Sequence, residues 1–289
     1  MQAAKTLETH QTGATGVTGA PLAESYWLLP MASLWKREVV RFVRQRSRVV
    51  GALGTPLVFW VVIGSGFGKS FVLGQPGASD DSGSTMGYLE YFFPGSIVLI
   101  VLFTAIFSTI SIIEDRREGF LQAVLAAPVR RSSIVLGKVL GSTTLALGQA
   151  LLFLLLAPLA GIPLTLGTLL GVAGVLVLVA IGLSGLGFLI AWPMDSMQGF
   201  HAVMNLLLMP MWLLSGAAFP ASGASSWVGV AMAFNPVTYH VAAVRHVLYW
   251  GSDRFTGNLP PFWLALLITV MFAGLTIALS ARAMIRSKR

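Results

Sequence analysis

The sequence predicts an all-α integral membrane protein with six transmembrane helices. Its 289 residues are 55% hydrophobic and only 10% charged, whereas soluble domains carry about 25% charged residues. Residues 139–194 and 196–244 contain no Asp, Glu, Lys or Arg. Because a helix of about 20 residues crosses the hydrocarbon core, each run can hold two crossings, or one crossing and a membrane-associated loop. This composition is typical of a multi-pass membrane protein.

The basic residues indicate the orientation of the chain. Of the 19 Lys and Arg residues, 16 lie before the first span, in the central loop or after the last span. Lys and Arg concentrate in cytosolic segments, so we expect both termini and the central loop in the cytosol. We expect the membrane to be a bacterial inner (plasma) membrane. The net charge of +8 does not indicate nucleic acid as a partner, because the basic residues flank the spans, where they face membrane lipid.

Turns and charges divide the chain into a tail and one membrane domain, residues 26–289. Residues 1–25 are rich in Thr, Gly, Ala and Gln and are expected to form a disordered cytosolic tail. The six spans are expected at about 49–67, 92–113, 139–160, 167–191, 197–219 and 262–281.

Two further segments of the membrane domain are expected to be helical without crossing the membrane. Residues of about 30–47 mix apolar and basic side chains, which predicts an interfacial helix whose basic groups reach anionic headgroups. Residues 220–261 are too many for a simple turn and are largely apolar. We expect a pair of short re-entrant helices there, on the outer side, broken at Asn235-Pro236.

Residues 114–138 are the most charged stretch of the chain and separate two charge-free runs. Apolar residues inside the stretch share one face of a helix: Phe120, Leu121, Val124 and Leu125. Pro128 is expected to end this helix. The pattern predicts a short amphipathic helix over about 114–127, facing the cytosol and suited to docking on a partner.

The same stretch resembles the signature of type-2 ABC transporter permeases, the ABC-2 exporter membrane subunits. The shared pattern is an acidic pair, two further charges, Gly, a short apolar helix, Ala-Pro-Val and a Leu-Gly-Lys that ends at Lys138, with Phe120 where a Thr is expected. In that family the segment is the coupling helix, which rests in a groove of the ATP-hydrolysing subunit. The resemblance implies these ATPase-docking residues: Glu114, Asp115, Arg116, Arg117, Glu118, Gly119, Phe120, Leu121, Val124, Leu125 and Pro128.

A second part of the resemblance lies between Leu214 and Arg245. The family consensus there runs Leu-Ser-Gly, a Pro, Asn-Pro-hydrophobic-Thr-Tyr and an Arg, and this chain matches it in order. The resemblance thus covers the chain from about Trp27 to its end. Together with the fifth span, it places the translocation lining at Met204, Met209, Met211, Trp212, Asn235, Tyr239 and Arg245.

Arg245 lies in an apolar segment, where an unpartnered charge is costly. It is expected either to pair with a carboxylate such as Asp253 or to meet a lipid phosphate or an anionic substrate. The methionines of the fifth span are expected to be adaptable apolar lining rather than copper ligands, and no metal-ligand spacing occurs elsewhere.

The resemblance implies a permease that moves a hydrophobic or amphipathic substrate, such as a drug, a lipid or a lipid-linked saccharide, out of the cytoplasm. The chain is not expected to be an enzyme or to bind a cofactor. Residues 66–70 end like a P-loop, but Ile63 stands where the fingerprint requires Gly. ATP and Mg would bind two copies of a separate ATPase chain, and a second permease chain, identical or related, would complete the complex.

Two other classes of protein stay open. Residues 182–185 match the Gly-x-Ser-Gly of rhomboid intramembrane proteases, whose serine needs a His to take its proton. His201 is the candidate base but is expected near the cytosolic side, whereas rhomboid sites open to the outer face, and small residues in membrane helices commonly serve close packing. The other class is a secondary transporter, which an inverted internal repeat would favour, and no convincing repeat is evident.

Overall fold

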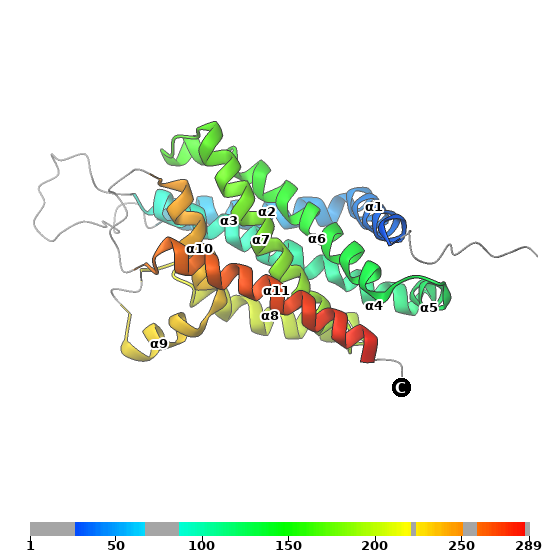
Figure 1. The fold of residues 1–289 in the computed structure, drawn as a ribbon. Coiled ribbons are helices and arrows are strands. Elements are labelled where there is room, and N and C mark those ends of the chain that lie inside the picture. Colours follow the sequence, from blue (N-terminus) through cyan, green and yellow to red (C-terminus); the bar gives the residue numbers. More distant parts are fainter. Residues whose placement is uncertain (1–26, 67–86, 221–223, 251–258, 287–289) are drawn as a thin grey trace, which may run out of the picture.

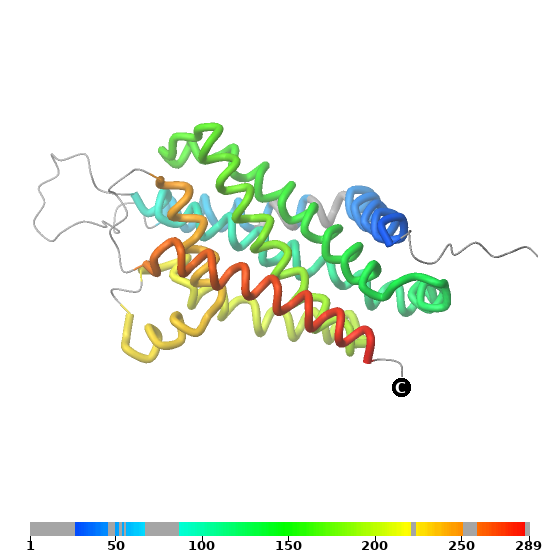
Figure 2. The backbone as a smooth tube through the Cα atoms, in the orientation of Figure 1, coloured from blue at the N-terminus to red at the C-terminus, as the bar shows by residue number. Residues whose placement is uncertain are grey.

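The computed structural model describes residues 27–66, 87–220, 224–250 and 259–286. Helices and connecting turns account for these residues, with no strand in the described part of the chain, so the predicted all-α class is confirmed. The helices form an elongated bundle in which the long ones run along the long axis (Figures 1 and 2). The predicted tail, residues 1–25, lies outside the described residues.

The centre of the bundle is a continuous helical segment of 30 residues, Tyr88–Arg117. It consists of α3 (Tyr88–Phe107), a 3-10 turn (Ser108–Ile110) and α4 (Ser111–Arg117). Its apolar residues surround the whole helix, which is the pattern of a helix buried on all sides. Accordingly α2, α6, α7, α8 and α10 all contact α3. The expected span at 92–113 is therefore about one turn longer at each end.

The other helices surround this segment and are, in chain order, α1 (Leu28–Arg44), α2 (Arg46–Gly66), α5 (Phe120–Ala126), α6 (Arg131–Leu154), a 3-10 turn (Ala157–Ala160), α7 (Leu166–Ala191), α8 (Met197–Leu213), α9 (Ser226–Phe234), α10 (Pro236–Leu248) and α11 (Phe262–Arg286). α6 and α7 form a hairpin, and α11 lies along α7. α1, α4 and α5 gather at one end of the bundle, and α9 and α10 lie at the other (Figure 1).

Four helical segments are long and apolar enough to cross a membrane, judged by length and composition over the described residues: Tyr88–Arg117, α6, α7 and α11. The other two predicted spans correspond to α2, whose apolar part is Pro56–Gly66, and to α8, which has 17 residues. α8 ends at Leu213, before the expected 219, because the chain turns at Gly216, whose φ of 75° is not helical. The sequence thus placed the end of this segment too late.

Two short helices occupy the described part of the stretch 220–261, and Asn235 separates them. The Asn235 side chain accepts a hydrogen bond from the Val237 backbone N–H at 3.0 Å, and Pro236 fills the first helical position of α10. An Asn cap followed by Pro is a strong start signal for a helix, which explains the break between α9 and α10. Their placement in the membrane stays a prediction.

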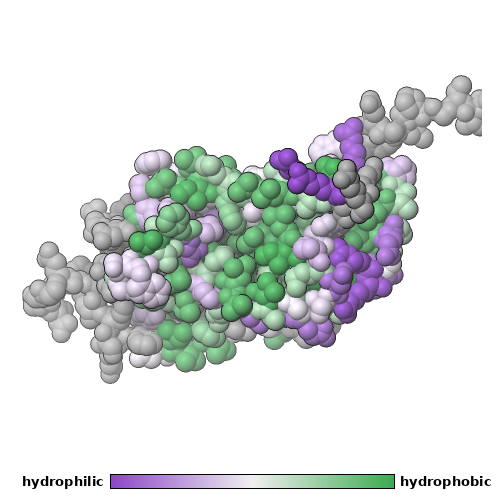
Figure 3. Space-filling model, turned by 90° about the horizontal axis from the view of Figure 1, so that it is seen from below, coloured by the Kyte–Doolittle hydropathy of each residue, from purple (hydrophilic) through white to green (hydrophobic). Residues whose placement is uncertain are grey.

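The surface separates by polarity along the long axis. Hydrophilic side chains gather at the end that carries α1, α4 and α5, and hydrophobic side chains cover the middle (Figure 3). We call the hydrophilic end, formed by α1, α4, α5 and the start of α6, the charged end.

Candidate functional site

The turn that links α4 to α5 depends on Gly119. This residue has a φ of 78°, a left-handed conformation that glycine adopts without a Cβ clash. The helix expected over 114–127 is therefore wrong at its start. Residues 114–117 complete the central helix, because no glycine or proline interrupts the chain before Gly119, and α5 alone is the short helix. Its last residue, Ala126, agrees with the stop expected from Pro128.

Asp115 is the centre of a buried group of charges at the charged end and is 0% exposed. Arg37 Nη1 and Nη2 donate to its Oδ2 at 3.0 Å and its Oδ1 at 2.7 Å, and Arg41 Nη1 donates to Oδ1 at 2.9 Å. Lys138, from α6, donates both to Asp115 and to Glu38 of α1. Buried charges are tolerated when they are paired and hydrogen-bonded. These five residues, the Asp115 cluster, therefore join α1, α4 and α6.

Arg37 connects the cluster to α5 as well. Its guanidinium carbon lies 3.8 Å from the centre of the Phe120 ring, a cation–π geometry. Burial acts to lower the pKa of Arg37, but its hydrogen bond to Asp115 and the nearby carboxylates raise that pKa overall. Arg37 is therefore firmly cationic, as the pairing requires.

The prediction that the basic side chains of α1 reach anionic headgroups is wrong for Arg37 and Arg41. Both lie against Asp115 instead, because a buried carboxylate attracts the nearest cations more strongly than exposed headgroups can. Lys36 and Arg44 are exposed, and their contact with headgroups stays a prediction.

Glu114 and Glu118 extend the same contacts toward the surface. Arg41 Nη2 lies 2.8 Å from Glu114 Oε2 and 3.4 Å from Glu118 Oε1. Arg41 thus contacts the acidic residues at the two ends of the last turn of α4.

Arg116 and Arg117 hold the turn between α7 and α8. Arg116 Nη1 donates to the Met194 carbonyl and to Asp195 Oδ1, both at 2.9 Å, and Arg116 also donates to the Trp192 carbonyl. Arg117 donates from Nε at 3.0 Å and from Nη2 at 2.7 Å to the Asp195 carbonyl. The two arginines thus cap the C-terminal end of α7, where free carbonyls favour cations.

The start of α6 is fixed in a similar way. Arg131 Nη1 donates to the Met284 carbonyl of α11 at 2.6 Å. On the other side of α6, a Cβ added to Gly137 would lie 2.8 Å from Leu34 Cβ, and one added to Gly141 would lie 2.6 Å from Glu38 Cβ. α1 can therefore pack this closely on α6 only where α6 carries glycine.

α5 presents one buried and one exposed face. Leu121 is buried, and Phe120, Val124 and Leu125 are half-buried against the body of the protein. The exposed positions carry small or polar side chains: Gln122, Ala123, Ala126, Ala127 and Pro128. The predicted docking residues thus differ in exposure. Asp115 and Leu121 are buried and stabilise the turn, whereas Arg117, Glu118 and Pro128 are exposed and accessible to a partner.

The predicted lining residues of α8 lie on two faces of that helix. Met204 and Trp212 belong to a buried stripe, with Phe200 and Leu208, that packs on α3, and Trp212 Nε1 donates to the Gly95 carbonyl at 2.9 Å. Met211 is half-buried, whereas Met209 is 37% exposed. Met204 and Trp212 therefore anchor α8 to the central helix.

The other three predicted lining residues belong to α10 and its cap. Asn235 donates to the carbonyls of Met211 and Leu214, and the Tyr239 hydroxyl donates to the Ala233 carbonyl at 2.8 Å. Arg245 is 2% exposed. These side chains hold the connection between α8 and α10 in place.

Arg245 is bound by backbone and by an aromatic ring. Its Nη2 donates to the Gly216 carbonyl at 2.9 Å and to the Tyr91 carbonyl at 3.2 Å, and its guanidinium carbon lies 4.0 Å from the centre of the Tyr91 ring. The Tyr91 hydroxyl donates to the same Gly216 carbonyl at 2.8 Å. Arg245 thus clamps the segment after α8 onto α3, and Asp253, its predicted carboxylate partner, lies outside the described residues.

The serine that resembles a rhomboid nucleophile is buried in the bundle. Ser184 is 0% exposed, and within the described residues its Oγ has no hydrogen-bond partner. His201 is exposed and stacks on Phe107. A Cβ on Gly182 would lie 2.7 Å from the Phe272 ring of α11, so the small residues of this motif permit close helix packing. The described residues also contain no group of three His, Cys, Asp or Glu that could hold a metal.

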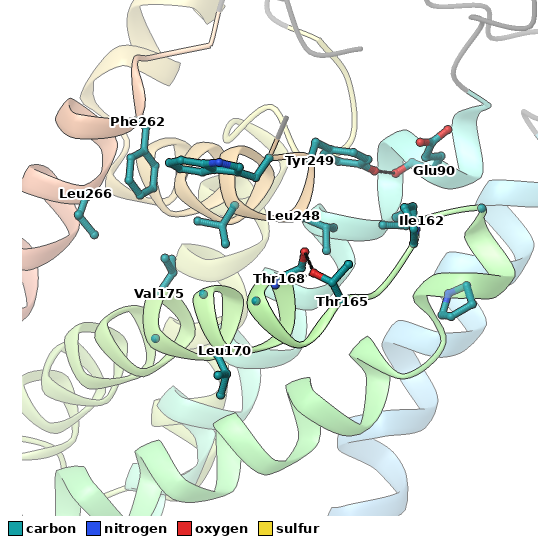
Figure 4. Close-up of a pocket in the computed structure, with 18 of the residues that line it drawn as sticks. Glu90, Ile162, Thr165, Thr168, Leu170, Val175, Leu248, Tyr249, Phe262 and Leu266 are labelled. Atoms are coloured by element: carbon teal, nitrogen blue, oxygen red, sulfur yellow. Dashed lines mark hydrogen bonds between the residues drawn. The ribbon is translucent and has the colours of Figure 1, made fainter. Parts of the chain in front are cut away.

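A cleft of about 1350 Å³ opens at the other end of the bundle, between α7, α10 and α11. Figure 4 shows Thr165, the N-cap of α7, with Thr168 and Val175 of α7 on one side, and Tyr249 and Phe262 across from them. The Tyr249 hydroxyl donates to the Glu90 carbonyl at 2.9 Å. None of the seven predicted lining residues is among the described residues that line this cleft. The sequence signal that could have found it is the row of glycines on α7.

Buried helices, apolar outer faces and a charged end define a multi-pass membrane protein. The profile of the family described as ABC-2 type transporter matches residues 31–249. The chain belongs to this family of ABC transporter membrane permeases, as its sequence predicted.

Relatives with curated names agree with this membership. The chain is 25% identical over 237 residues to "Putative transport permease ycf38" of Cyanophora paradoxa, covering 81% of this chain and 79% of the relative. It is 25% identical over 236 residues to "Nodulation protein J" of Rhizobium leguminosarum bv. trifolii, covering 80% and 84%. A "Putative transport permease ycf38" of Porphyra purpurea is 26% identical over 166 residues, covering 56% of each chain.

Proposed function

We propose that this chain is the permease subunit of an ATP-driven type-2 ABC exporter in a bacterial inner membrane. It spans the membrane six times with both termini in the cytosol, and it moves a hydrophobic or amphipathic substrate (a drug, a lipid or a lipid-linked saccharide) outward. Two copies of a separate ATPase chain bind ATP and Mg and power the transport. A second permease chain, identical or related, completes the complex.

The observation that carries this proposal is the exposed face of α5, which directly follows the central helix Tyr88–Arg117. The central helix runs without a break from α3 into α4, and Gly119 joins it directly to α5. The Asp115 cluster holds α1 and α6 to the same point. A displacement of α5 would therefore move the central helix, because no flexible loop separates the two.

The chemistry of the α5 face suits a protein partner. Ala123, Ala126 and Ala127 are small and exposed, so a groove in the ATPase could approach the α5 backbone closely. Arg117 and Glu118 border this face with opposite charges, which would orient a partner of complementary charge. ATP binding shifts the permease only if the ATPase favours one of its conformations, and contact with a rigid α5 supplies such a bias.

The translocation path in this proposal lies along the outward face of α8. This face, opposite the stripe that packs on α3, exposes large apolar side chains: Val203, Leu206, Leu207, Met209 and Leu213. A second permease chain facing it would enclose an apolar path, consistent with a hydrophobic cargo. The permease names of the relatives from Cyanophora paradoxa and Porphyra purpurea support a transport role.

Two matched substitutions test the docking role. Gln122 of α5 and Gln198 of α8 are both exposed and both lie near the charged end. Tagged protein purified in mild detergent from its host should carry an ATPase chain with a P-loop. Gln122→Arg should release that chain, whereas Gln198→Arg should retain it. Equal retention by both variants, or a purified complex without any ATPase, would refute the proposal.

A further inference from the structure

The cleft between α7, α10 and α11 has the length of one leaflet. Its α7 side runs from Gly167 to Leu178 within a helix long and apolar enough to cross a membrane. At 1.5 Å per residue this side is about 16 Å long. The hydrocarbon core of a bilayer is about 30 Å thick, so the cleft extends over about half of that depth. Phe262 and Leu266, on the α11 side, belong to the first turns of a second such helix.

The cleft opens sideways onto an apolar surface. Two of its lining residues, Leu170 and Trp250, are 65% and 73% exposed. Trp263, next to the lining residue Phe262, is 66% exposed. Tryptophan is enriched where a membrane protein meets the interface between hydrocarbon and headgroups. These exposed apolar and tryptophan side chains suit contact with lipid hydrocarbon and headgroups.

The floor of the cleft is open because α7 carries glycine there. A Cβ on Gly174 would meet nothing within 4 Å, and one on Gly167 would meet only Thr165 Oγ1, at 3.9 Å. These two positions leave open space beside α7, whereas a Cβ on Gly171, between them, would lie 2.7 Å from Val247 Cγ1, so α10 packs closely on α7 there. The volume exceeds the roughly 300–1,000 Å³ of pockets for compact ligands, which favours an extended occupant.

Charge decides which part of a lipid fits. Glu90 is the single charged residue among the described residues of the lining, and none of them is basic. The described lining residues offer a phosphate no cation to pair with, whereas apolar side chains such as Val175 and Leu248 would cover a hydrocarbon chain. We propose that the cleft binds one acyl chain of a phospholipid from the leaflet that surrounds this end of the bundle.

Photolabelling in a bilayer tests this directly and does not depend on the partner ATPase. The full chain is reconstituted in vesicles of phosphatidylethanolamine and phosphatidylglycerol with a trace of phosphatidylcholine that carries a diazirine on one acyl chain. After illumination and digestion, mass spectrometry locates the adducts. We expect residues 167–178 and the facing turns of α10 and α11 to be labelled several-fold more than the lipid-facing surface of α6.

Matched glycine variants complete the test. Gly174→Leu and Gly167→Leu place a side chain in the open space beside α7, while Gly148→Leu adds the same side chain on α6, where a Cβ also meets nothing within 4 Å. The first two should reduce cleft labelling several-fold at unchanged thermal stability, and Gly148→Leu should not. Even labelling around the protein, labelling unchanged by both cleft variants, crosslinks to another protein chain there, or labelling by a diazirine fatty acid but not by the phospholipid would overturn the proposal.

Discussion

Arg37 Nη2 lies 2.7 Å from Asp115 Oδ1, although the two residues are 78 positions apart in the sequence. This contact joins the N-terminal helix α1 to the last turn of the central helix. Lys138 and Arg41 surround the same carboxylate. The turn that presents α5 is therefore held by charges from two other helices.

Removing the Asp115 carboxylate should destabilise the protein strongly. Asp115→Ala leaves Arg37, Arg41 and Lys138 without their shared partner, and breaking a buried ion pair from one side costs about 3–5 kcal/mol. Unfolding of the purified protein in mixed micelles with increasing SDS measures this change. Glu118→Ala is the control: Glu118 is 58% exposed and 3.4 Å from Arg41, so its loss should cost less than about 1 kcal/mol. Equal effects of the two substitutions would contradict the buried cluster.

The sequence predicted the helices well and the pairing of their charges poorly. Hydropathy and charge-free runs located α7 and α11, because apolar length alone identifies such helices. The span expected at 139–160 overlaps α6 but lies about two turns too late, because α6 begins at Arg131, among charged residues that hydropathy excludes, and ends at Leu154. The Asn-Pro signal placed the break between α9 and α10. In contrast, Lys138 and Asp115 appeared as two charges of an exposed loop, and only the three-dimensional packing of α1 on α6 shows that they are buried together. The cleft was missed because its walls come from helices far apart in the sequence.

The contact between α1 and α6 should not tolerate a side chain at Gly141. A Cβ there would lie 2.6 Å from Glu38 Cβ, and such overpacking typically costs about 1–3 kcal/mol. Gly141→Leu should therefore lower the temperature of thermal unfolding. Gly148→Leu on the same helix has open space and should stay within about 0.5 kcal/mol of the wild type. A stable Gly141→Leu protein would show that α1 does not pack on α6 as described.

Arg245 should act in folding rather than in cargo recognition. Arg245→Gln removes the charge that binds the carbonyls of Tyr91 and Gly216, and leaving such buried groups unsatisfied costs about 1–3 kcal/mol. The amount of folded protein and the rate of export in vesicles should then fall together. A variant that folds normally yet fails to export would assign Arg245 to the cargo instead.

Ser184→Ala should leave transport unchanged. Ser184 is buried against its neighbours in the bundle, and alanine removes a hydroxyl that has no hydrogen-bond partner among the described residues. The measurements are the rate of export by the variant and the reaction of the wild type and the variant with a serine-directed probe. Loss of export without misfolding, together with labelling of the wild type by the probe, would favour the protease alternative.

The proposed orientation of the chain in the membrane can be measured by labelling introduced cysteines, because the chain contains no cysteine of its own. Gln122→Cys lies on α5, and Leu159→Cys lies in the turn between α6 and α7, where Leu159 is 72% exposed. A membrane-impermeant maleimide should label Leu159→Cys in spheroplasts with an intact membrane and Gln122→Cys only after permeabilisation. The reverse pattern would invert the orientation, and labelling of both from outside would exclude the six-span arrangement.

The central claim is that α5 contacts an ATPase, and a photocrosslink from α5 tests it most directly. A photoreactive amino acid replaces Gln122 in one variant and Gln198 in a second, each in the full chain and its native membrane. Illumination should crosslink the Gln122 variant, but not the Gln198 variant, to a chain with a P-loop. If neither position crosslinks to such a chain while the protein remains folded and active in transport, then α5 does not couple this permease to ATP.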